Sequence, residues 1–330
     1  MNRCLELAQN ALPSAMPNPA VGAVVVFENQ IIGEGYTSAF GGNHAEVNAI
    51  NAVKDKTLLS KSTLYVSLEP CSHYGKTPPC VDLVLKYQIP KIIIGTLDCN
   101  PKVSGNGLRK LLENGKKVTV GVLEKECLTL NKRFFTFFNK KRPYVILKWA
   151  ASQDGFLAPN QELNLDRKPV WISNPFSRQL VHYWRSQEQA ILVGTQTVLI
   201  DNPTLTTRDA DGKNPIRIVL DQNNRLPSSS YVFDNQAETL VITKNEIDFE
   251  QDIAVQIAAF LFQKNIQSVI VEGGLQTLQT FIDANIWDEA RVFVGNILLE
   301  SGIKQPVFVA HPPQKKMVFD DELFTYYNND

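Results

Sequence analysis

The sequence predicts an α/β protein made of two domains, and three observations support this. The chain has 330 residues, which is long for one hydrophobic core and comfortable for two domains of about 150 residues. Short apolar strand patterns alternate with helical patterns, which is typical of sheets covered by helices. The charged run Lys140-Lys141-Arg142-Pro143 interrupts this alternation. We therefore expect one domain over residues 1–142 and another over residues 143–330.

The composition is that of an ordinary globular protein. Hydrophobic residues make up 44% of the chain and charged residues 20%, and the net charge of -1 gives no basic excess that would favour nucleic acid. The first residues form no apolar signal segment, and no apolar run approaches the roughly 20 residues that span a bilayer. Five cysteines without a disulfide-scaffold spacing fit a reducing compartment. We expect a cytoplasmic protein that binds neither nucleic acid nor membrane.

The first half predicts a sheet with covering helices, because strand and helix periodicities alternate between turn signals. A stiff turn at residues 17–22 leads into a hairpin, and each later strand is followed by a helix. The expected elements are helix 2–12, strands 23–27 and 31–36, helix 44–53, strand 63–67, helix 79–87, strand 91–95, helix 108–114 and a helical stretch 123–138.

The second half predicts another sheet, with shorter strands and longer connections. Asn174-Pro175 is a helix start signal, because asparagine caps and proline fits the first helical position. The expected elements are strand 144–151, a helix from 175 to about 185, strands 190–193, 216–220, 239–243 and 268–271, and helix 275–284.

Four residues of the first half have the types and spacing of a catalytic metal site. His44 and Glu46 stand at the start of a predicted helix, and Cys71 and Cys80 follow the next predicted strand. His/Cys/Cys is a standard ligand set for catalytic zinc, which leaves the fourth position to water. Glu46 can carry a proton to and from that water without binding the metal, because zinc lowers the pKa of the water towards neutrality. This constellation occurs in zinc deaminases that act on cytosine-like rings.

Each of these residues alone has an ordinary explanation, since a single histidine or cysteine is usually a surface or core residue. Together they favour catalytic zinc, because a closed structural site would leave Glu46 without a role. The two cysteines are nine positions apart rather than three. The metal geometry survives if the intervening loop folds back, which the stiff Pro78-Pro79 favours.

Two further features leave alternatives open. Asn18 lies between two prolines. It either stabilises a turn or binds a polar heterocycle through its side chain. Glu272-Gly273-Gly274 lies between a predicted strand and a predicted helix. It is either an ordinary connecting loop or an anion-binding site at the helix N-terminus. No G-x-G-x-x-G follows a strand, which disfavours a conventional Rossmann dinucleotide site.

Several motifs together resemble the bifunctional deaminase/reductase family of riboflavin biosynthesis. They are Pro17-Asn18-Pro19-Ala20-Val21-Gly22, His44-Ala45-Glu46, Leu68 to Cys80, Asn100-Pro101 with Val103, Gly105 and Gly107, Ser152-x-Asp154-Gly155, Asp201-Asn202-Pro203-x-Leu205-Thr206-x-Arg208, Pro215 to Asp221, and Glu272-Gly273-Gly274. The resemblance covers essentially the whole chain. The eight residues between the cysteines, with Thr-Pro-Pro before the second, are its most specific part.

The resemblance implies a cytidine-deaminase-like three-layer α/β/α first domain and a dihydrofolate-reductase-like α/β second domain. The first would remove the 2-amino group of 2,5-diamino-6-(5-phosphoribosylamino)pyrimidin-4(3H)-one by hydrolysis, and the second would use NADPH to reduce the ribosyl group to ribityl. Zn²⁺ would be held by His44, Cys71 and Cys80, with Glu46 as the catalytic proton carrier. Asn18 would bind the pyrimidine edge, and Lys76 could meet the substrate phosphate.

For the second reaction, the resemblance implies one set of cofactor contacts and one of substrate contacts. The NADPH contacts would be Ala151, Trp171, Thr197, Asp201 and Gly274. The substrate contacts would be Arg185, Leu205, Arg208 and Glu272, with Lys148 as an additional candidate. Arg185 and Arg208 have the side chains of bidentate phosphate clamps. A homo-oligomer is also a family-level expectation.

One departure from the family pattern concerns phosphate recognition. Pro169 stands where the family has a substrate-binding serine, so that contact is lost or is supplied by a neighbour such as Lys168. Lys244 and Arg225 are the hypotheses for binding the 2′-phosphate that distinguishes NADPH from NADH.

Other interpretations stay open at this point. The chain could be a zinc deaminase of another base with an inactive second domain, or a binding protein whose zinc is structural.

Overall fold

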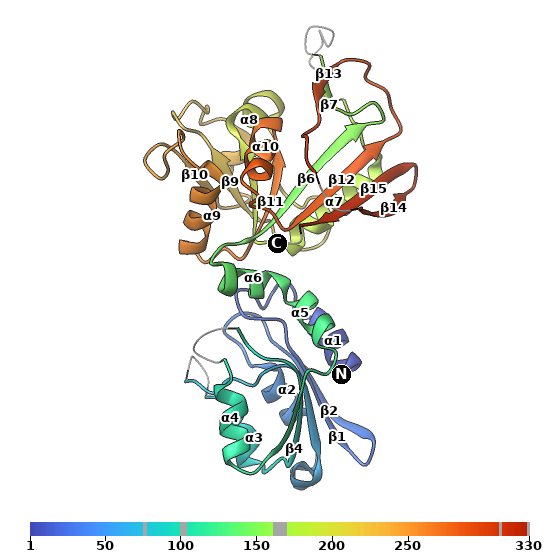
Figure 1. The fold of residues 1–330 in the computed structure, drawn as a ribbon, viewed down its shortest axis with the longest axis vertical. Helices are drawn as coiled ribbons and strands as arrows, with labels where there is room; N and C mark the ends of the chain where they lie inside the picture. The colour runs from blue at the N-terminus through green and yellow to red at the C-terminus, as the bar shows by residue number, and fades with distance from the viewer. Residues whose placement is uncertain (75–77, 100–103, 161–169, 310–311, 329–330) are drawn as a thin grey trace. The chain divides into compact units, whose positions relative to one another are not determined.

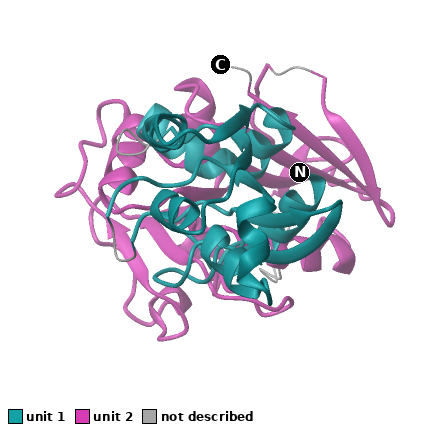
Figure 2. Ribbon diagram, turned by 90° about the horizontal axis from the view of Figure 1, so that it is seen from below, with its two compact units in different colours: residues 1–141 teal, residues 142–330 magenta. Residues whose placement is uncertain are grey.

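The chain forms two compact units, residues 1–141 and 142–330, which Figure 2 draws in different colours. The structure is a computed structural model that describes residues 1–74, 78–99, 104–160, 170–309 and 312–328. The division falls within the charged run at residues 140–143. Across these described stretches, every helix is too short or too polar to cross a bilayer.

Unit 1 is a three-layer α/β/α structure around a sheet in the order β2-β1-β3-β4-β5. Strand β1 is antiparallel to β2 and β3, whereas β3, β4 and β5 run parallel. Helices α2, α3 and α4 lie on one side of the sheet, and α1 and α5 lie on the other (Figure 1). The bounds are α1 Asn2–Gln9, β1 Gly22–Phe27, β2 Gln30–Tyr36, α2 Ala45–Ala52, β3 Thr63–Leu68, α3 Cys80–Lys86, β4 Lys91–Thr96, α4 Asn106–Glu113, β5 Lys117–Val120, α5 Glu124–Leu130 and α6 Lys132–Lys140.

Two glycines of β2 let helix α2 approach the sheet closely. A Cβ atom at Gly33 would lie 2.3 Å from the Ala49 carbonyl oxygen, and one at Gly35 would lie 2.4 Å from the Ala49 nitrogen. Larger side chains there would push α2 away. This close packing fixes the start of α2, where His44 is the N-terminal flanking residue in an extended conformation.

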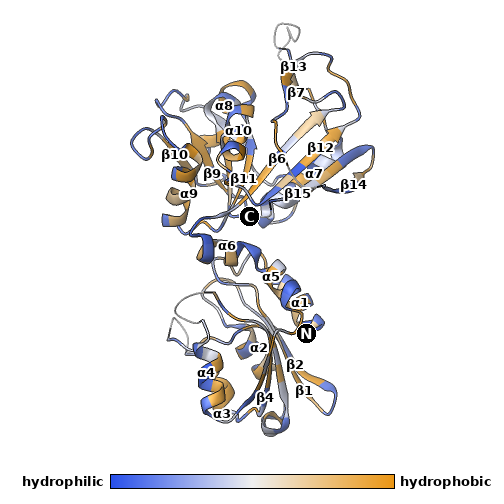
Figure 3. Ribbon diagram, viewed as in Figure 1, coloured by the Kyte–Doolittle hydropathy of each residue, from blue (hydrophilic) through white to orange (hydrophobic). Residues whose placement is uncertain are grey.

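Unit 2 is built on an eight-stranded sheet in the order β10-β9-β8-β11-β6-β12-β15-β14. The strands from β10 to β12 are parallel, and β15 and β14 add an antiparallel edge. Figure 3 shows β6, β9 and β11 mainly in the hydrophobic colour, as expected for strands covered on both faces. The bounds are β6 Tyr144–Ser152, β7 Phe156–Pro159, α7 Pro175–Gln187, β8 Ala190–Gly194, α8 Thr195–Asp201, β9 Ile216–Leu220, β10 Thr239–Ile242, α9 Ile253–Gln263, β11 Ser268–Gly273, α10 Leu275–Asp283, β12 Glu289–Gly295, β13 Gly302–Lys304, β14 Gln314–Val318 and β15 Asp321–Tyr327.

Helices cover both faces of this sheet and enclose two parts of its core. Helices α9 and α10 pack on the face that carries Val145, Leu147 and Val292. Helix α7 packs against Phe293 and, through Trp184, against Ile146 on the opposite face. The two faces alternate along β6 because successive side chains of a strand point in opposite directions.

The predicted elements mostly occur where expected, and three differences have physical reasons. Helix α1 ends at Gln9 rather than at residue 12, before the prolines Pro13 and Pro17. The stretch 123–138 is two helices, α5 and α6, because Asn131 turns its amide towards the backbone of Ala20. The strands after residue 284 were not predicted, and β14 in particular is an edge strand with exposed side chains.

Candidate functional site

The candidate metal site of unit 1 lies at one end of the sheet, where three chain segments meet. Strands β2 and β3 both end there, while the antiparallel β1 begins there, with Gly22 opposite Tyr36 and Ala23 opposite Val66. The segment after β2 carries His44 into α2, and the segment after β3 carries Cys71. Cys80 is the first residue of α3. Residues far apart in sequence are thereby gathered at one edge of the sheet.

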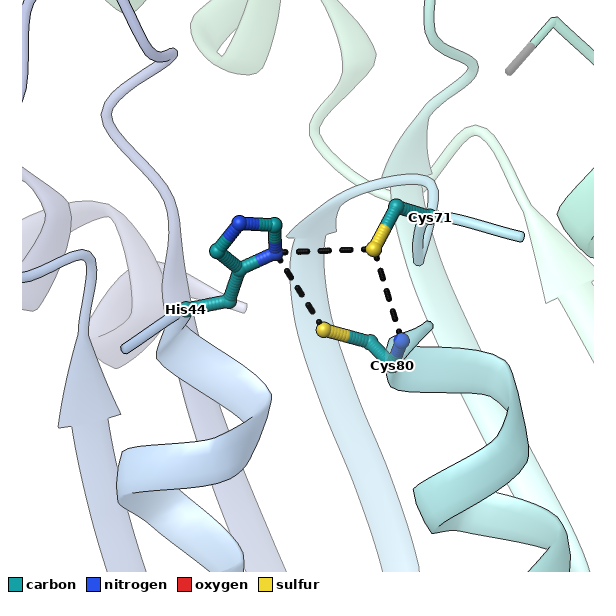
Figure 4. Close-up of side chains that lie close together, drawn as sticks. All are labelled: His44, Cys71 and Cys80. Carbon is teal, nitrogen blue, oxygen red and sulfur yellow. Dashed lines mark hydrogen bonds between the residues drawn. The ribbon is translucent and has the colours of Figure 1, made fainter. Parts of the chain in front are cut away.

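The side chains of His44, Cys71 and Cys80 point towards one another (Figure 4). The Nδ1 atom of His44 lies 3.5 Å from the Cys71 sulfur and 3.3 Å from the Cys80 sulfur. All three ligand atoms lie within 4.8 Å of one another. One nitrogen and two sulfurs at this spacing fit a single zinc ion, whose bonds to them are about 2.0–2.3 Å long. The donor set therefore fits the zinc that the sequence predicts.

The three candidate ligands shift one another's pKa values. Hydrogen bonding with the Cys80 thiol lowers the pKa of Cys71. The contact with Cys71 raises the pKa of His44 to about 8. The hydrogen bond to Cys71, together with burial, raises the pKa of Cys80. A divalent cation stabilises the deprotonated ligands and would take the place of the protons held by the cluster.

Glu46 is buried beside the three ligands, on the first turn of α2. Its exposure is 4%, and it interacts with the Cys80 side chain. Burial, and after it the charge of Cys71, raise the pKa of Glu46 to about 7. A carboxyl group with a pKa near neutrality is suited to both accepting and donating protons.

Two polar residues that sequence reasoning missed hold the segments around this site. Glu69 accepts backbone N–H hydrogen bonds from Asp98 at 3.2 Å, Gly105 at 3.0 Å and Leu108 at 3.0 Å. Asn131 bonds both the N–H and the carbonyl of Ala20, at 2.8 and 2.9 Å. Sequence alone gives no signal for either role except that Glu69 stands next to the Pro70-Cys71 pair.

Of the two residues predicted to bind the deaminase substrate, Asn18 and Lys76, the structure describes only Asn18. Asn18 is half-buried in the turn before β1, at the end of the sheet that carries the metal ligands, and its N–H bonds the Ala15 carbonyl at 2.9 Å. This placement agrees with both alternatives considered for Asn18. Lys76 lies outside the described residues, as do Lys168 and Pro169.

In unit 2, three predicted cofactor residues stand at the carboxyl ends of neighbouring parallel strands. Ala151 is the second-last residue of β6, Thr197 is in the first turn of α8 after β8, and Gly274 follows β11. A Cβ atom at Gly274 would lie 3.4 Å from the Thr197 hydroxyl oxygen, so these two segments are in contact. Parallel α/β sheets bind ligands at this end, where helix N-termini favour anions.

The other predicted cofactor residues are more exposed. Trp171 is 59% exposed, and the Arg178 guanidinium lies 4.5 Å from its ring centroid. Asp201 is the last residue of α8. Lys244 follows β10, and its N–H donates to the Gln222 carbonyl at 3.3 Å.

The predicted substrate residues include a buried charge cluster. Arg185 donates two hydrogen bonds to the Glu272 carboxylate, at 2.9 and 2.7 Å, and the Lys148 ammonium lies 3.9 Å from the same carboxylate. Burial alone would raise the pKa of Glu272, but the charges of Arg185 and Lys148 hold it at about 2. The Arg185 guanidinium is therefore bonded to Glu272, whereas the sequence predicted that it would be available to bind the substrate phosphate.

Leu205 and Arg208 occupy the segment between α8 and β9. Leu205 is 3% exposed, whereas the Arg208 side chain is 51% exposed. Arg208 reaches the Thr204 hydroxyl at 3.4 Å, and its Nε atom lies 3.9 Å from the Asp209 carboxylate. Arg208 is thus the more accessible of the two arginines.

Comparison with known proteins identifies related families for both units. Residues 1–96 match the family described as "Cytidine and deoxycytidylate deaminase zinc-binding region", and residues 143–321 match the "RibD C-terminal domain". The riboflavin biosynthesis protein RibD of Aquifex aeolicus is 39% identical over 319 residues, which cover 92% of this chain and 88% of the relative.

Solved structures give the same result. The crystal structure of a diaminohydroxyphosphoribosylaminopyrimidine deaminase/5-amino-6-(5-phosphoribosylamino)uracil reductase from Thermotoga maritima has a TM-score of 0.87 and 38% identity, covering 99% of this chain and 97% of its own. RibD of Acinetobacter baumannii has a TM-score of 0.85 and 29% identity, covering 100% and 98%. The predicted fold class, a deaminase-like α/β/α domain followed by an α/β reductase domain, is confirmed. The chain belongs to the RibD family of riboflavin biosynthesis proteins, which join a deaminase domain to a reductase domain.

Proposed function

We propose that this chain catalyses two consecutive reactions of riboflavin biosynthesis. The first hydrolyses the 2-amino group of 2,5-diamino-6-(5-phosphoribosylamino)pyrimidin-4(3H)-one to give 5-amino-6-(5-phosphoribosylamino)uracil and ammonia. The second reduces the ribosyl group of that product to ribityl with NADPH. Residues 1–142 carry the first activity and residues 143–330 the second. The observation that carries the proposal is the His44, Cys71 and Cys80 cluster with Glu46 buried beside it.

In the deamination, His44, Cys71 and Cys80 hold zinc. Zinc bound there lowers the pKa of water towards neutrality and thereby supplies a nucleophile at neutral pH. Glu46 would take one proton from the attacking water and deliver it to the ring nitrogen, and then pass the second proton of that water to the leaving amine, which departs as ammonia. Burial raises the pKa of Glu46 above the usual value of a carboxyl group, which favours its return to the protonated form after it accepts a proton. Asn18 binds the pyrimidine edge, and Lys76 meets the substrate phosphate.

Metal content and ammonia release, measured on the same samples, test the first activity. We expect the purified protein to contain zinc and to release ammonia from the diaminopyrimidine phosphate, and Cys80→Ser to lose both. A Cys80→Ser variant that lacks zinc but releases ammonia at the wild-type rate would refute the proposed site. A protein that unfolds on chelation yet never releases ammonia would instead contain structural zinc.

In the reduction, the carboxyl ends of β6, β8 and β11 bind the cofactor and the substrate. Ala151, Trp171, Thr197, Asp201 and Gly274 contact NADPH, which supplies the hydride. Arg208 binds the substrate phosphate, because its guanidinium is exposed and weakly engaged. Leu205, Glu272, Arg185 and Lys148 line the substrate position.

The second activity is tested by supplying the deaminated intermediate together with NADPH and following the absorbance of the cofactor. Oxidation of NADPH is expected, and no change in absorbance would refute the reductase assignment. We expect Arg208→Ala to raise the KM for the intermediate well before it alters the KM for NADPH. Equal losses for both would contradict a phosphate role for Arg208.

We also propose that the enzyme works in the cytoplasm, acts only on small phosphoribosylaminopyrimidines and forms a homo-oligomer. The net charge of -1 supports a protein without affinity for nucleic acid, and the free state of all five cysteines supports a reducing compartment. Sedimentation at several protein concentrations tests self-association, and a single monomeric species throughout would refute it.

A further inference from the structure

The segment that carries Arg208 has an unusual backbone. Two of its non-glycine residues have positive φ angles, 39° at Asn202 and 54° at Leu205. L residues rarely adopt this left-handed region, and bulky ones such as leucine do so only where the surrounding structure enforces it. The side chains that hold this segment therefore determine where Arg208 lies.

Two side chains of α7 hold the segment at one point, the carbonyl oxygen of Thr206. The Nδ1 atom of His182 lies 2.9 Å from this oxygen, and the Nη1 atom of Arg185 lies 3.1 Å from it. His182 and Arg185 stand three residues apart, so they project from the same face of the helix. His182 is 4% exposed and Thr206 is 3% exposed, so the contact is shielded from water.

The acceptors around His182 determine the proton on its ring. A carbonyl oxygen only accepts, so Nδ1 carries the proton that bonds Thr206. The Nε2 atom faces the Asp209 carboxylate at 3.1 Å. Burial, and then the charges of Arg185 and Arg208, lower the pKa of His182, while Asp209 acts in the opposite direction. Nδ1 carries its proton both in the charged ring and in the neutral ring protonated at Nδ1, so the Thr206 bond forms in either state, whereas Nε2 donates to Asp209 only in the charged ring.

Other side chains hold the flanks of the segment. The buried Arg217 donates to the Thr204 carbonyl at 3.3 Å. Asn214 accepts from the Thr207 N–H at 2.9 Å. His182 of α7, the helix of the Arg185–Glu272 pair, thus contacts the segment of Arg208 at two points, the Thr206 carbonyl and the Asp209 carboxylate.

We propose that His182 is a positioning residue for the reductase substrate: by holding the Thr206 carbonyl, it sets the place of Arg208. This rests on the proposed function of Arg208 as a phosphate ligand. His182 does not touch the substrate, so its loss weakens binding of the phosphorylated intermediate and leaves NADPH binding unchanged.

A matched pair of variants tests the hydrogen bond itself. Asparagine places an N–H donor near the position of Nδ1. Leucine has nearly the same shape as asparagine but no donor. We expect His182→Leu to raise the KM for the deaminated intermediate about tenfold and His182→Asn to raise it less than about threefold. The KM for NADPH, which reports on an intact unit 2, is expected to stay within about twofold of the wild type for both.

Combining the substitution with Arg208→Ala shows whether His182 acts through Arg208. If it does, His182→Leu adds less than about a twofold change in KM once Arg208 is gone. The same tenfold rise in both backgrounds, or equal effects of leucine and asparagine, would overturn the proposal.

An unchanged KM in Arg208→Ala alone would instead overturn the phosphate role of Arg208. A raised KM in Arg208→Ala with an unchanged KM in His182→Leu would overturn only the role of His182.

Discussion

Glu69 shows how one buried side chain shapes the deaminase site from outside the ligand set. Its carboxylate accepts three backbone N–H bonds, from Asp98, Gly105 and Leu108. Charge-assisted bonds of this kind are about twice as strong as neutral ones. The bonds tie the start of α4 to the segment that carries Cys71.

We therefore expect Glu69→Leu to lower the free energy of unfolding of unit 1 by about 2–4 kcal/mol, because three backbone donors lose a charged acceptor. The measurement is the urea concentration at which deaminase activity is lost. Glu113→Gln, at an exposed position of α4, is the control and is expected to change little. Equal stability of the two variants would contradict this role of Glu69.

The second prediction at the residue scale concerns pH. Glu272 has a pKa of about 2 in the folded protein, below its unfolded value of about 4.3. Its ion pairs therefore stabilise unit 2 fully above about pH 5, and this stabilisation is lost as the pH falls towards 2. We expect Glu272→Gln to lower stability by about 3 kcal/mol at pH 7 and to flatten its acid dependence.

Thermal unfolding of the wild type and Glu272→Gln between neutral and acid pH measures this difference. The exposed Glu250→Gln serves as the control for a change of net charge. Identical pH dependence of the wild type and Glu272→Gln would show that Glu272 is not paired.

At the scale of elements, the approach of α4 to the metal site depends on Gly107. A Cβ atom at Gly107 would lie 2.1 Å from the Pro70 carbonyl oxygen, directly before Cys71. Any other side chain must therefore displace either α4 or the ligand. We expect Gly107→Ala to lower zinc affinity about 10- to 100-fold, the range typical of changes around metal ligands.

Gly115 supplies the comparison, because it lies just after α4 at a φ of 71° with open space around its Cβ position. We expect Gly115→Ala to reduce stability by about 1 kcal/mol through backbone strain and to leave zinc affinity unchanged. Competition with a chelator measures both affinities. Equal zinc affinity in the two variants would contradict the proposed packing.

The sequence predicted the elements and residues whose signals are local. Strong periodicity located most strands, and residue type and spacing predicted the cluster that His44, Cys71 and Cys80 form in the structure. Long-range partners could not be predicted. No local sequence feature indicates that the Glu69 or His182 side chain hydrogen-bonds to backbone groups distant in the sequence. The pairing of Arg185 with Glu272 was missed for the same reason.

At the scale of the whole molecule, the two sets of site residues belong to different compact units. The zinc ligands lie in residues 1–141, and the proposed reductase residues lie in residues 142–330. We expect removal of zinc by a chelator to abolish ammonia release while the supplied intermediate is still reduced at the wild-type rate. Loss of both activities on chelation would show that the reductase depends on the metal site.

The central claim is that Glu46 moves protons beside a zinc ion held by His44, Cys71 and Cys80. Glu46→Gln tests it most directly, because the substitution keeps the shape of the side chain and removes the carboxylate. We predict that the variant keeps wild-type zinc content and that ammonia release falls by about 10²- to 10⁴-fold. Ammonia release at the wild-type rate, from a variant that still contains zinc, would contradict the account.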